Sequence, residues 1–370
     1  MTSAAVAANR RGPRICTDMG YVCARLRARF ARLLPPGTVE ILRGLPSLAE
    51  LFSALLPTDY GPSLKDWVLD VNDLGEWETA LTATFARRVG QVRSLIDDSV
   101  PAYAYLVDGE WDAHHLRALL RRLMHGVGEA DAPHVGAEFI PLGNFTHDRY
   151  RDALAARSPL DLCFRIQPWL PLWAGTLRSF LEPPRGPAIR LRETELLLDE
   201  EHFRRLRQCA PRIHSREDAS VIRSYVALLA DLTNLRTALR FLGQRLPREQ
   251  VQSLYLRGGT LAEATFVALM AADGIEAICR RLSRGPLTAV LDQGRSALVN
   301  TGRASVFERP GDRQLLQLVH RLARRCPVSV AVPLDYLARS RNEWINLKMV
   351  ACGIRYQLPA ARVREGLVYV

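Results

Sequence analysis

One short pattern of residue types occurs three times along the chain, at long and nearly equal intervals. It consists of an acid, two variable residues, an amide or histidine, a leucine and a base, and it lies at 112–117 (DAHHLR), 231–236 (DLTNLR) and 343–348 (EWINLK). Successive acids are 119 and 112 residues apart. Self-similarity at a long period indicates repeated structural units. The residues of this repeat motif are Asp112, His115, Leu116, Arg117, Asp231, Asn234, Leu235, Arg236, Glu343, Asn346, Leu347 and Lys348.

The apolar residues around the second copy have the spacing of an α-helix. Between 222 and 242 they recur every three or four residues, which traces one face of a long helix. Another amphipathic stretch begins after Ser47, a helix N-cap type, with Glu50 completing a capping box. The best strand candidate, 326–334 (CPVSVAVPL), contains prolines, so we expect an extended connector there. The sequence predicts an all-α fold.

Similarities around the motif copies set the predicted domain boundaries. A Leu-Pro pair follows both later acids by fifteen residues, and Pro247 and Pro359 suit the first turn of a new helix. Segments 181–187 (LEPPRGP) and 307–313 (FERPGDR) are expected to be loops or hinges. We therefore predict three similar helical bundles arranged as a pseudo-threefold object. The predicted segments are a loose N-terminal tail at 1–13, followed by helical repeats at 14–137, 138–253 and 254–370.

Composition bounds the class of protein. The 370 residues are 48% hydrophobic, which is ordinary for a globular chain. The seven cysteines are scattered without a C-x-x-C pair, which favours reduced thiols in the cytosol. No run of about 18 apolar residues is present, so we expect no transmembrane segment. The net charge of +11 is carried almost entirely by arginine, and a basic surface favours an acidic partner, a nucleic acid or an anionic membrane.

Signatures of catalysis are absent from the sequence. There is no phosphate-binding loop ending in Gly-Lys-Ser/Thr, no G-x-G-x-x-G after a strand, no HExxH and no G-x-S-x-G. The paired glycines at 256–260 (LRGGT) are expected to form a turn. Adjacent residues His114 and His115 diverge on a helix, so we expect a hydrogen-bonded structural role for His115. An acidic pair at 97–98 is expected to be solvated surface. The prediction is a protein without a metal, cofactor or small-molecule ligand.

Two other functions stay open at this point. Arginine alternates with leucine at helical spacing in 25–34, 116–125 and 320–327, which suits a nucleic-acid-binding protein. However, acidic segments interleave, and no helix-turn-helix, zinc finger or RNP motif is present. An unrecognised helical enzyme is the second alternative, although no convergent set of titratable residues emerges.

The repeat motif itself favours a structural device over an active site. A buried amide and carboxylate need hydrogen-bond partners, and backbone groups at the junction between one bundle and the next would supply them. The motif would then fix the register between units. The alternative is that paired helices use the same residues only internally.

The order of these motifs resembles the C subunit of prokaryotic V-type (A-type) ATPases, the relative of eukaryotic V-ATPase subunit d. The resemblance covers about residues 14–370. It includes the Asp-x-x-Asn-Leu-Lys/Arg pattern, from which His115 departs, and the C-terminal Glu-x-x-Asn helix followed by Leu358-Pro359. The N-terminal helix and Thr-x-Tyr-Gly turn of that family match Gly20, Tyr21, Ala24, Arg25, Arg27, Thr58, Tyr60 and Gly61.

The resemblance implies a fold and a function. Members of this family are all-α, funnel-shaped and not enzymes, with three bundles around a pseudo-threefold axis. They link the central shaft to the membrane proteolipid ring on the cytoplasmic face. By resemblance we expect a peripheral rotor adaptor that transmits torque, with the ring and the shaft subunits as partners and no nucleic acid.

Overall fold

The computed structural model describes residues 18–96, 101–125, 139–182, 191–213 and 215–369. Within these ranges every regular element is a helix, so the predicted all-α class is confirmed. The α-helices are α1 (Met19–Phe30), α2 (Thr38–Arg43), α3 (Leu48–Leu55), α4 (Gly61–Trp67), α5 (Leu74–Arg93), α6 (Pro101–His125), α7 (His147–Leu154), α8 (Pro159–Ile166), α9 (Pro171–Leu181), α10 (Leu191–Arg212), α11 (Arg216–Arg240), α12 (Arg248–Ser253), α13 (Glu263–Met270), α14 (Ile275–Arg281), α15 (Thr288–Thr301), α16 (Glu308–Arg325), α17 (Ala331–Arg355) and α18 (Ala360–Gly366), with one 3₁₀ helix, η2 (Ala304–Phe307).

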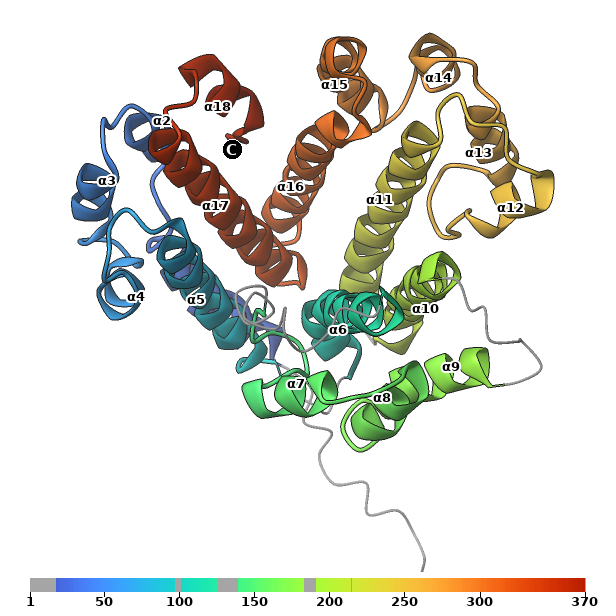
Figure 1. Cartoon of the computed structure of the whole chain (residues 1–370), viewed down its shortest axis with the longest axis horizontal. Coiled ribbons are helices and arrows are strands. Elements are labelled where there is room, and N and C mark those ends of the chain that lie inside the picture. The colour runs from blue at the N-terminus through green and yellow to red at the C-terminus, as the bar shows by residue number, and fades with distance from the viewer. Residues whose placement is uncertain (1–17, 97–100, 126–138, 183–190, 214, 370) are drawn as a thin grey trace, which may run out of the picture.

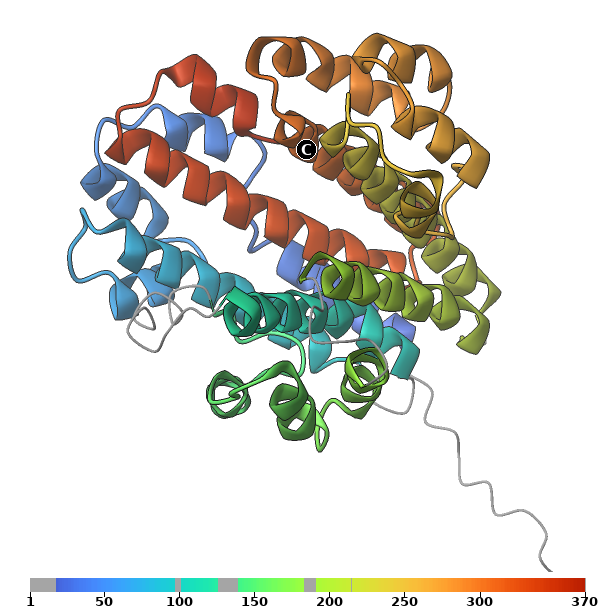
Figure 2. The same cartoon turned by 45° about the vertical axis from the view of Figure 1, so that its right-hand side comes forward.

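Six long helices form the frame of the molecule. They are α5, α6, α10, α11, α16 and α17, and each contacts the next in that order. The ring of contacts closes because α17 packs against α5, so the C-terminal part of the chain meets the N-terminal part (Figure 1). In the turned view, α17 lies between the blue N-terminal helices and the orange helices that precede it (Figure 2). The three motif copies lie on α6, α11 and α17, each 25 residues long.

The short helices form three groups outside this frame, α2–α4, α7–α9 and α12–α15 (Figure 1). Each group shares an apolar cluster with one motif helix, and the motif leucine lies in that cluster. Leu116 packs with α7–α9, Leu235 with α12–α15, and Leu347 with α2–α4. Each cluster therefore draws residues from two of the predicted repeats. The division into repeats and the pseudo-threefold arrangement stay predictions, and the tail at 1–13 lies outside the described residues.

Two segments expected to be irregular are helical instead. Residues 308–313 of the predicted hinge begin α16, and residues 331–334 of the predicted connector begin α17. Both prolines, Pro310 and Pro333, lie in the first turn, where a missing N–H costs no hydrogen bond. Gly311 also lets α16 approach α11, since an added Cβ would lie 3.2 Å from Arg236 Nη2. Of the other predicted hinge, α9 ends at Leu181, and residues 183–187 lie outside the described part, as does the acidic pair at 97–98.

Several local predictions are confirmed. Ser47 caps α3 by accepting a hydrogen bond from the backbone N–H of Glu50. A new helix begins after each Leu-Pro pair, but Pro247 and Pro359 are the N-cap residues of α12 and α18, one position before the predicted first turn. Residues 256–260 form a non-helical turn before α13. These elements need only local sequence, because caps and prolines act within one turn.

Candidate functional site at the three motif copies

The acids of the first two motif copies bind the backbone of a loop further along the chain, which precedes α13 for Asp231 and α7 for Asp112. Asp231 accepts hydrogen bonds from the N–H groups of Thr260 at 2.9 Å and Leu261 at 2.8 Å, and from the Thr260 hydroxyl at 2.6 Å. Asp112 accepts from the backbone N–H of Asn144 at 2.7 Å and from its side-chain amide at 2.8 Å. Each carboxylate therefore fixes a loop against a long helix.

A glycine precedes the residue bound by each of these two acids, and its lack of a side chain makes room for the carboxylate. A Cβ at Gly259 would lie 2.0 Å from Asp231 Oδ1, and one at Gly143 would lie 2.5 Å from Asp112 Oδ1. Gly143 also has a φ of 68°, a conformation that other residues adopt at a cost. Burial raises the pKa of Asp112 to about 7, against the hydrogen bonds from Asn144 that lower it.

The third acid joins the C-terminal part of the chain to the N-terminal part. Glu343 accepts a hydrogen bond from the backbone N–H of Leu34 at 2.7 Å and pairs with Arg88 Nη1 at 2.7 Å. Arg88 lies on α5 and is completely buried. Its guanidinium also binds Asp59 at 2.9 Å and the Tyr60 hydroxyl at 3.3 Å. Burial, reinforced by the Glu343 charge, raises the pKa of Tyr60. A buried, charge-assisted network thus closes the ring between α17 and α5.

The two motif asparagines make the same backbone pairing. Asn234 donates to the carbonyl of Leu256 at 2.8 Å and accepts from its N–H at 2.9 Å. Asn346 donates to the carbonyl of Val368 at 2.8 Å and accepts from its N–H at 3.1 Å. In both cases the partner follows 22 residues later, and both side chains are buried. Each amide satisfies both backbone groups of one residue, as a neighbouring strand would.

His115 occupies the amide position of the first copy but does not reproduce this pairing. Its ring is buried among the rings of Phe139, Phe145 and Tyr150, whose centroids lie 5.2, 4.9 and 5.7 Å away. Its Nε2 atom has no hydrogen-bond partner among the described residues. Burial lowers the pKa of His115 to about 4, against backbone hydrogen bonding that raises it. The neutral ring is therefore a packing element of this copy.

The three motif bases all pair with an acid on the next long helix of the ring. Arg117 of α6 binds Asp199 of α10, and Lys348 of α17 binds Glu78 of α5. Arg236 of α11 lies 3.4 Å from Asp312 of α16. Each motif copy therefore contacts three segments, through its acid, its buried leucine and its base. What this arrangement can do is hold packed helices in register.

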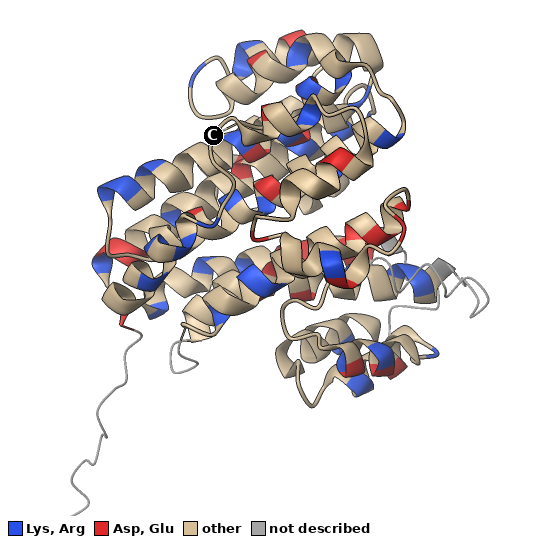
Figure 3. Ribbon diagram, turned by 90° about the vertical axis from the view of Figure 1, so that its left-hand side faces the viewer, with Lys and Arg blue, Asp and Glu red and all other residues tan. Residues whose placement is uncertain are grey.

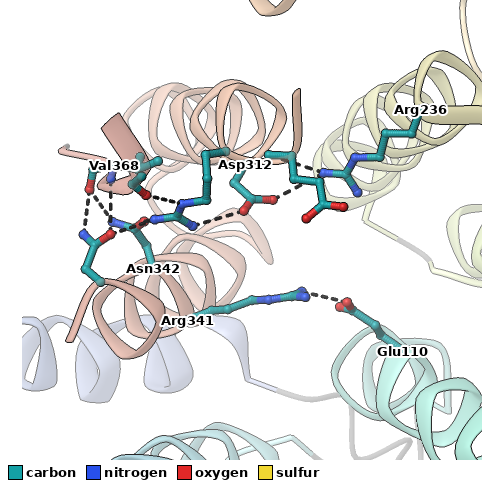
Figure 4. Close-up of polar contacts among 10 residues, drawn as sticks. Glu110, Arg236, Asp312, Arg341, Asn342 and Val368 are labelled. Carbon is teal, nitrogen blue, oxygen red and sulfur yellow. Dashed lines mark hydrogen bonds and ion pairs between the residues drawn. The ribbon is translucent and has the colours of Figure 1, made fainter. Parts of the chain in front are cut away.

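A chain of polar contacts connects the second and third copies (Figure 4). Arg309 on α16 donates to the side-chain oxygen of Asn346 at 2.7 Å and pairs with Asp312 at 3.1 Å. Asp312 is also the partner of Arg236. The contacts run from the backbone of Val368 through Asn346 and Arg309 to α11, so two copies share one network.

The ring of long helices surrounds a cavity of about 90 Å³. Its lining is apolar on α5, which contributes Phe85, and mixed on α16, which contributes Leu316 together with Arg309 and Asp312. Arg341 of α17 and Glu110 of α6 meet in it at 2.6 Å, pointing toward each other from facing helices (Figure 4). Both side chains are 44% exposed, so this pair is open to solvent although it lies inside the ring.

The N-terminal residues on which the resemblance rests divide into a packed turn and a mostly exposed helix face. Tyr21, Ala24 and Arg25 are exposed on α1, where Gly20 also lies, and Arg27 donates to the carbonyl of Pro327 at 2.6 Å. In the turn, the Thr58 hydroxyl donates to the carbonyl of Leu55 at 2.6 Å. Tyr60 is buried, and a Cβ at Gly61 would lie 2.0 Å from the carbonyl oxygen of Leu56.

The structure gives no support to the alternative chemistries. Among the described residues, no group of three or more His, Cys, Asp or Glu side chains could hold a metal ion. None of the described helices combines the length and the apolar character needed to cross a bilayer. Basic and acidic residues interleave along the same helices (Figure 3). A nucleic-acid surface would instead gather its positive charge on one face or stripe.

Sequence reasoning missed the partners of the motif. Arg88, Glu78, Asp199 and Asp312 were not singled out, because each lies far along the chain from the residue it binds. One signal was available in the sequence. An acid recurs at 78, 199 and 312, each time ahead of a motif copy, at intervals of 121 and 113 residues.

Comparison with known proteins identifies the family. Residues 22–366 match the profile described as ATP synthase (C/AC39) subunit. Among curated proteins, the C subunit of the A-type ATP synthase of Methanocaldococcus jannaschii is 24% identical over 94% of this chain and 86% of its own length. That of Pyrococcus abyssi is 25% identical over 94% and 90%. The C subunit of the V-type ATP synthase of Thermus thermophilus is 27% identical over 95% and 98%. The chain belongs to the ATP synthase (C/AC39) subunit family.

Proposed function

We propose that this chain is a non-catalytic rotor adaptor of a V/A-type ATP synthase. It links the central shaft to the membrane proteolipid ring and transmits torque between ATP synthesis or hydrolysis and the transport of protons or sodium. It is a peripheral protein on the cytoplasmic face of the membrane. Membership of the family supports a place in the ATP synthase complex, and the closed ring of long helices supports the mechanical role.

The observation that carries the proposal is the closed ring of six long helices. A part that transmits torque must resist twisting, and a ring in which every helix is braced by its neighbours does so better than an open array. The contact of α17 with α5 closes this ring, and the buried pair of Glu343 and Arg88 holds it there. Single exposed ion pairs contribute about 0–1 kcal/mol, so rigidity of this kind needs many contacts acting together.

The surface that docks the shaft and the surface that docks the proteolipid ring would lie on different parts of the molecule. The exposed pair of Arg341 and Glu110, on the inner side of the ring of long helices, would offer polar contacts to the foot of a shaft. The three groups of short helices, spread around the frame, would spread contact over several loops of a proteolipid ring (Figure 1). Contacts spread in this way tolerate a mismatch between the symmetry of the proteolipid ring and that of the shaft.

The proposal is tested with membranes that lack this chain and with the same membranes after purified chain has been added back. Inverted membrane vesicles would be prepared from cells that produce the rotary ATPase without this chain, and both ATP hydrolysis and ATP-driven ion uptake would be measured. We expect hydrolysis by the soluble head to persist, uptake to be lost, and purified chain to restore uptake. Ion uptake that is normal without the chain would exclude the adaptor function.

A further inference from the structure

A groove of about 600 Å³ lies between α11 and the segment that joins α15 to α16. Its apolar part includes Leu239, Ile275 and Leu298, which are almost fully buried, and Val299, which is 68% exposed. The basic residues of the lining are Arg236, Arg240 and Arg303, and its acid is Glu308. The described lining thus combines an apolar floor with an excess of positive charge.

Arg236 has the longest ion pair of the three motif bases. It lies 3.4 Å from Asp312 Oδ1, and the other oxygen of that carboxylate binds Arg309 at 3.1 Å. The only other hydrogen bond of Arg236 is a marginal one of 3.5 Å to the carbonyl of Glu308, and its Nε has no partner among the described residues. The Nε atom is buried, but the side chain is 36% exposed and a guanidinium has five N–H donors, so its exposed end retains capacity for a further acceptor.

The other two arginines stand beside it. Arg240 follows Arg236 by four residues on α11, which places both on the same face of the helix. Arg303 comes from the opposite wall, directly after Gly302 ends α15 with a φ of 65°. Both Arg240 and Arg303 are exposed. Three guanidinium groups from two walls therefore face one groove.

We propose that this groove docks an acidic segment of a partner protein. Its carboxylates would pair with the three arginines, since the planar guanidinium matches a carboxylate in a two-bond geometry. An apolar side chain between the acids would lie on Val299 and the buried leucines. A protein segment fits better than a lipid bilayer, because the site is recessed whereas a bilayer presents a broad surface. The inference goes beyond the adaptor function, because it assigns a binding chemistry to one groove of the isolated chain.

Binding of a synthetic peptide to the purified full chain tests the proposal. The probe is a rhodamine-labelled peptide of alternating glutamate and leucine, and the control peptide has glutamine in place of glutamate. Binding is followed by fluorescence anisotropy at low and high salt. We expect the acidic peptide to bind, the control peptide not to bind, and the affinity to fall with rising salt because the pairing is electrostatic.

The variant Arg240→Glu/Arg303→Glu leaves the motif intact and reverses two charges of the groove. It should weaken binding of the acidic peptide by about tenfold or more, because attraction becomes repulsion. The matched control is Arg216→Glu, the same change at an exposed arginine of the same helix, about 36 Å away along its axis. This control should bind like the unmodified chain. Circular dichroism melts of all three proteins verify folding.

Three outcomes would overturn the proposal. The first is equal affinity of the groove variant and the control variant for the acidic peptide. The second is equal binding of the glutamate and glutamine peptides. The third is arginine-dependent binding to phosphatidylglycerol vesicles or to inorganic phosphate without binding of the peptide, which would assign the groove to a phosphoryl group instead.

Discussion

Glu343 of α17 and Arg88 of α5 form an ion pair of 2.7 Å, although 255 residues of chain separate them. Both side chains are buried, at 8% and 1% exposure. The pair joins the last motif helix to the N-terminal part of the protein and so completes the ring of long helices. Since the cysteines in the described part of the chain are free, the closure of this ring there depends on noncovalent contacts of this kind.

Removing the charge of Glu343 should destabilise the protein strongly. Glu343→Gln leaves the Arg88 guanidinium buried with Asp59 as its remaining carboxylate, and breaking a buried pair on one side costs about 3–5 kcal/mol. The control is Glu110→Gln, which breaks the half-exposed pair with Arg341 and should cost about 1 kcal/mol or less. Denaturant unfolding of both variants measures the difference. Equal losses of stability would show that the Glu343 pair has no special role in closing the ring.

Gly259 should not tolerate a side chain. In Gly259→Ala the new methyl group would meet Asp231 Oδ1 at 2.0 Å and displace the carboxylate from the Thr260 and Leu261 N–H groups. Overpacking of this kind costs about 1–3 kcal/mol. Gly175→Ala is the control, because it lies within α9 with nothing near its Cβ position, and it should stabilise by about 0.5–1 kcal/mol. Thermal melts would show opposite shifts, and a neutral result at Gly259 would contradict the loop-clamping role of Asp231.

The sequence was sufficient for the helix of the second motif copy and for the burial of its asparagine. The periodicity around Asp231 predicted a helix that the structure extends over Arg216–Arg240, and burial and hydrogen bonding of Asn234 follow from the cost of an unpaired amide. The predictions of irregular structure around Pro310 and Pro333 were wrong. These prolines were interpreted as breaks, whereas in a first turn they are compatible with a helix.

What the sequence could not supply is the identity of distant partners. Arg88 is completely buried although its local sequence is that of an ordinary amphipathic helix, and its burial results from the packing of α17 and of the turn at Asp59 and Tyr60 on α5. The partner of Arg236 is likewise on another helix, where Asp312 binds both Arg236 and Arg309. Local patterns determine which face of a helix is buried, but they do not determine which helix buries it.

His115 should make stability depend on pH. Its pKa is about 4 in the folded protein and near 6.5 when unfolded, so the unfolded chain binds more protons between these values. Stability therefore rises with pH across this window, and the His115 contribution should be about 2 kcal/mol lower at pH 5 than at pH 7. His115→Asn places the amide of the other copies here and removes this contribution.

The measurement is the difference in unfolding free energy between pH 5 and pH 7 for both proteins. Asp112, whose pKa burial raises to about 7, contributes with the opposite sign in both, so the comparison isolates His115. The variant should lose less stability on acidification than the unmodified chain. Identical pH profiles would mean that His115 is solvated and protonated normally in the folded state.

The coupling of ATP hydrolysis to ion transport tests the adaptor function and the motif together. Asn346→Leu leaves both backbone groups of Val368 without their partner, which costs about 1–3 kcal/mol and loosens one junction of the ring. Asn234→Leu does the same at Leu256. The control is Asn300→Leu, the same change at an exposed residue of α15.

The decisive quantity is the ratio of ATP-driven ion uptake to ATP hydrolysis in membranes that carry each variant. We predict that Asn346→Leu and Asn234→Leu lower this ratio while hydrolysis persists, and that Asn300→Leu leaves it unchanged. A proportional fall of both activities would assign the motif to assembly of the complex instead of rigidity. An unchanged ratio, together with an unchanged melting temperature, would contradict the role of the motif in a torque-transmitting ring.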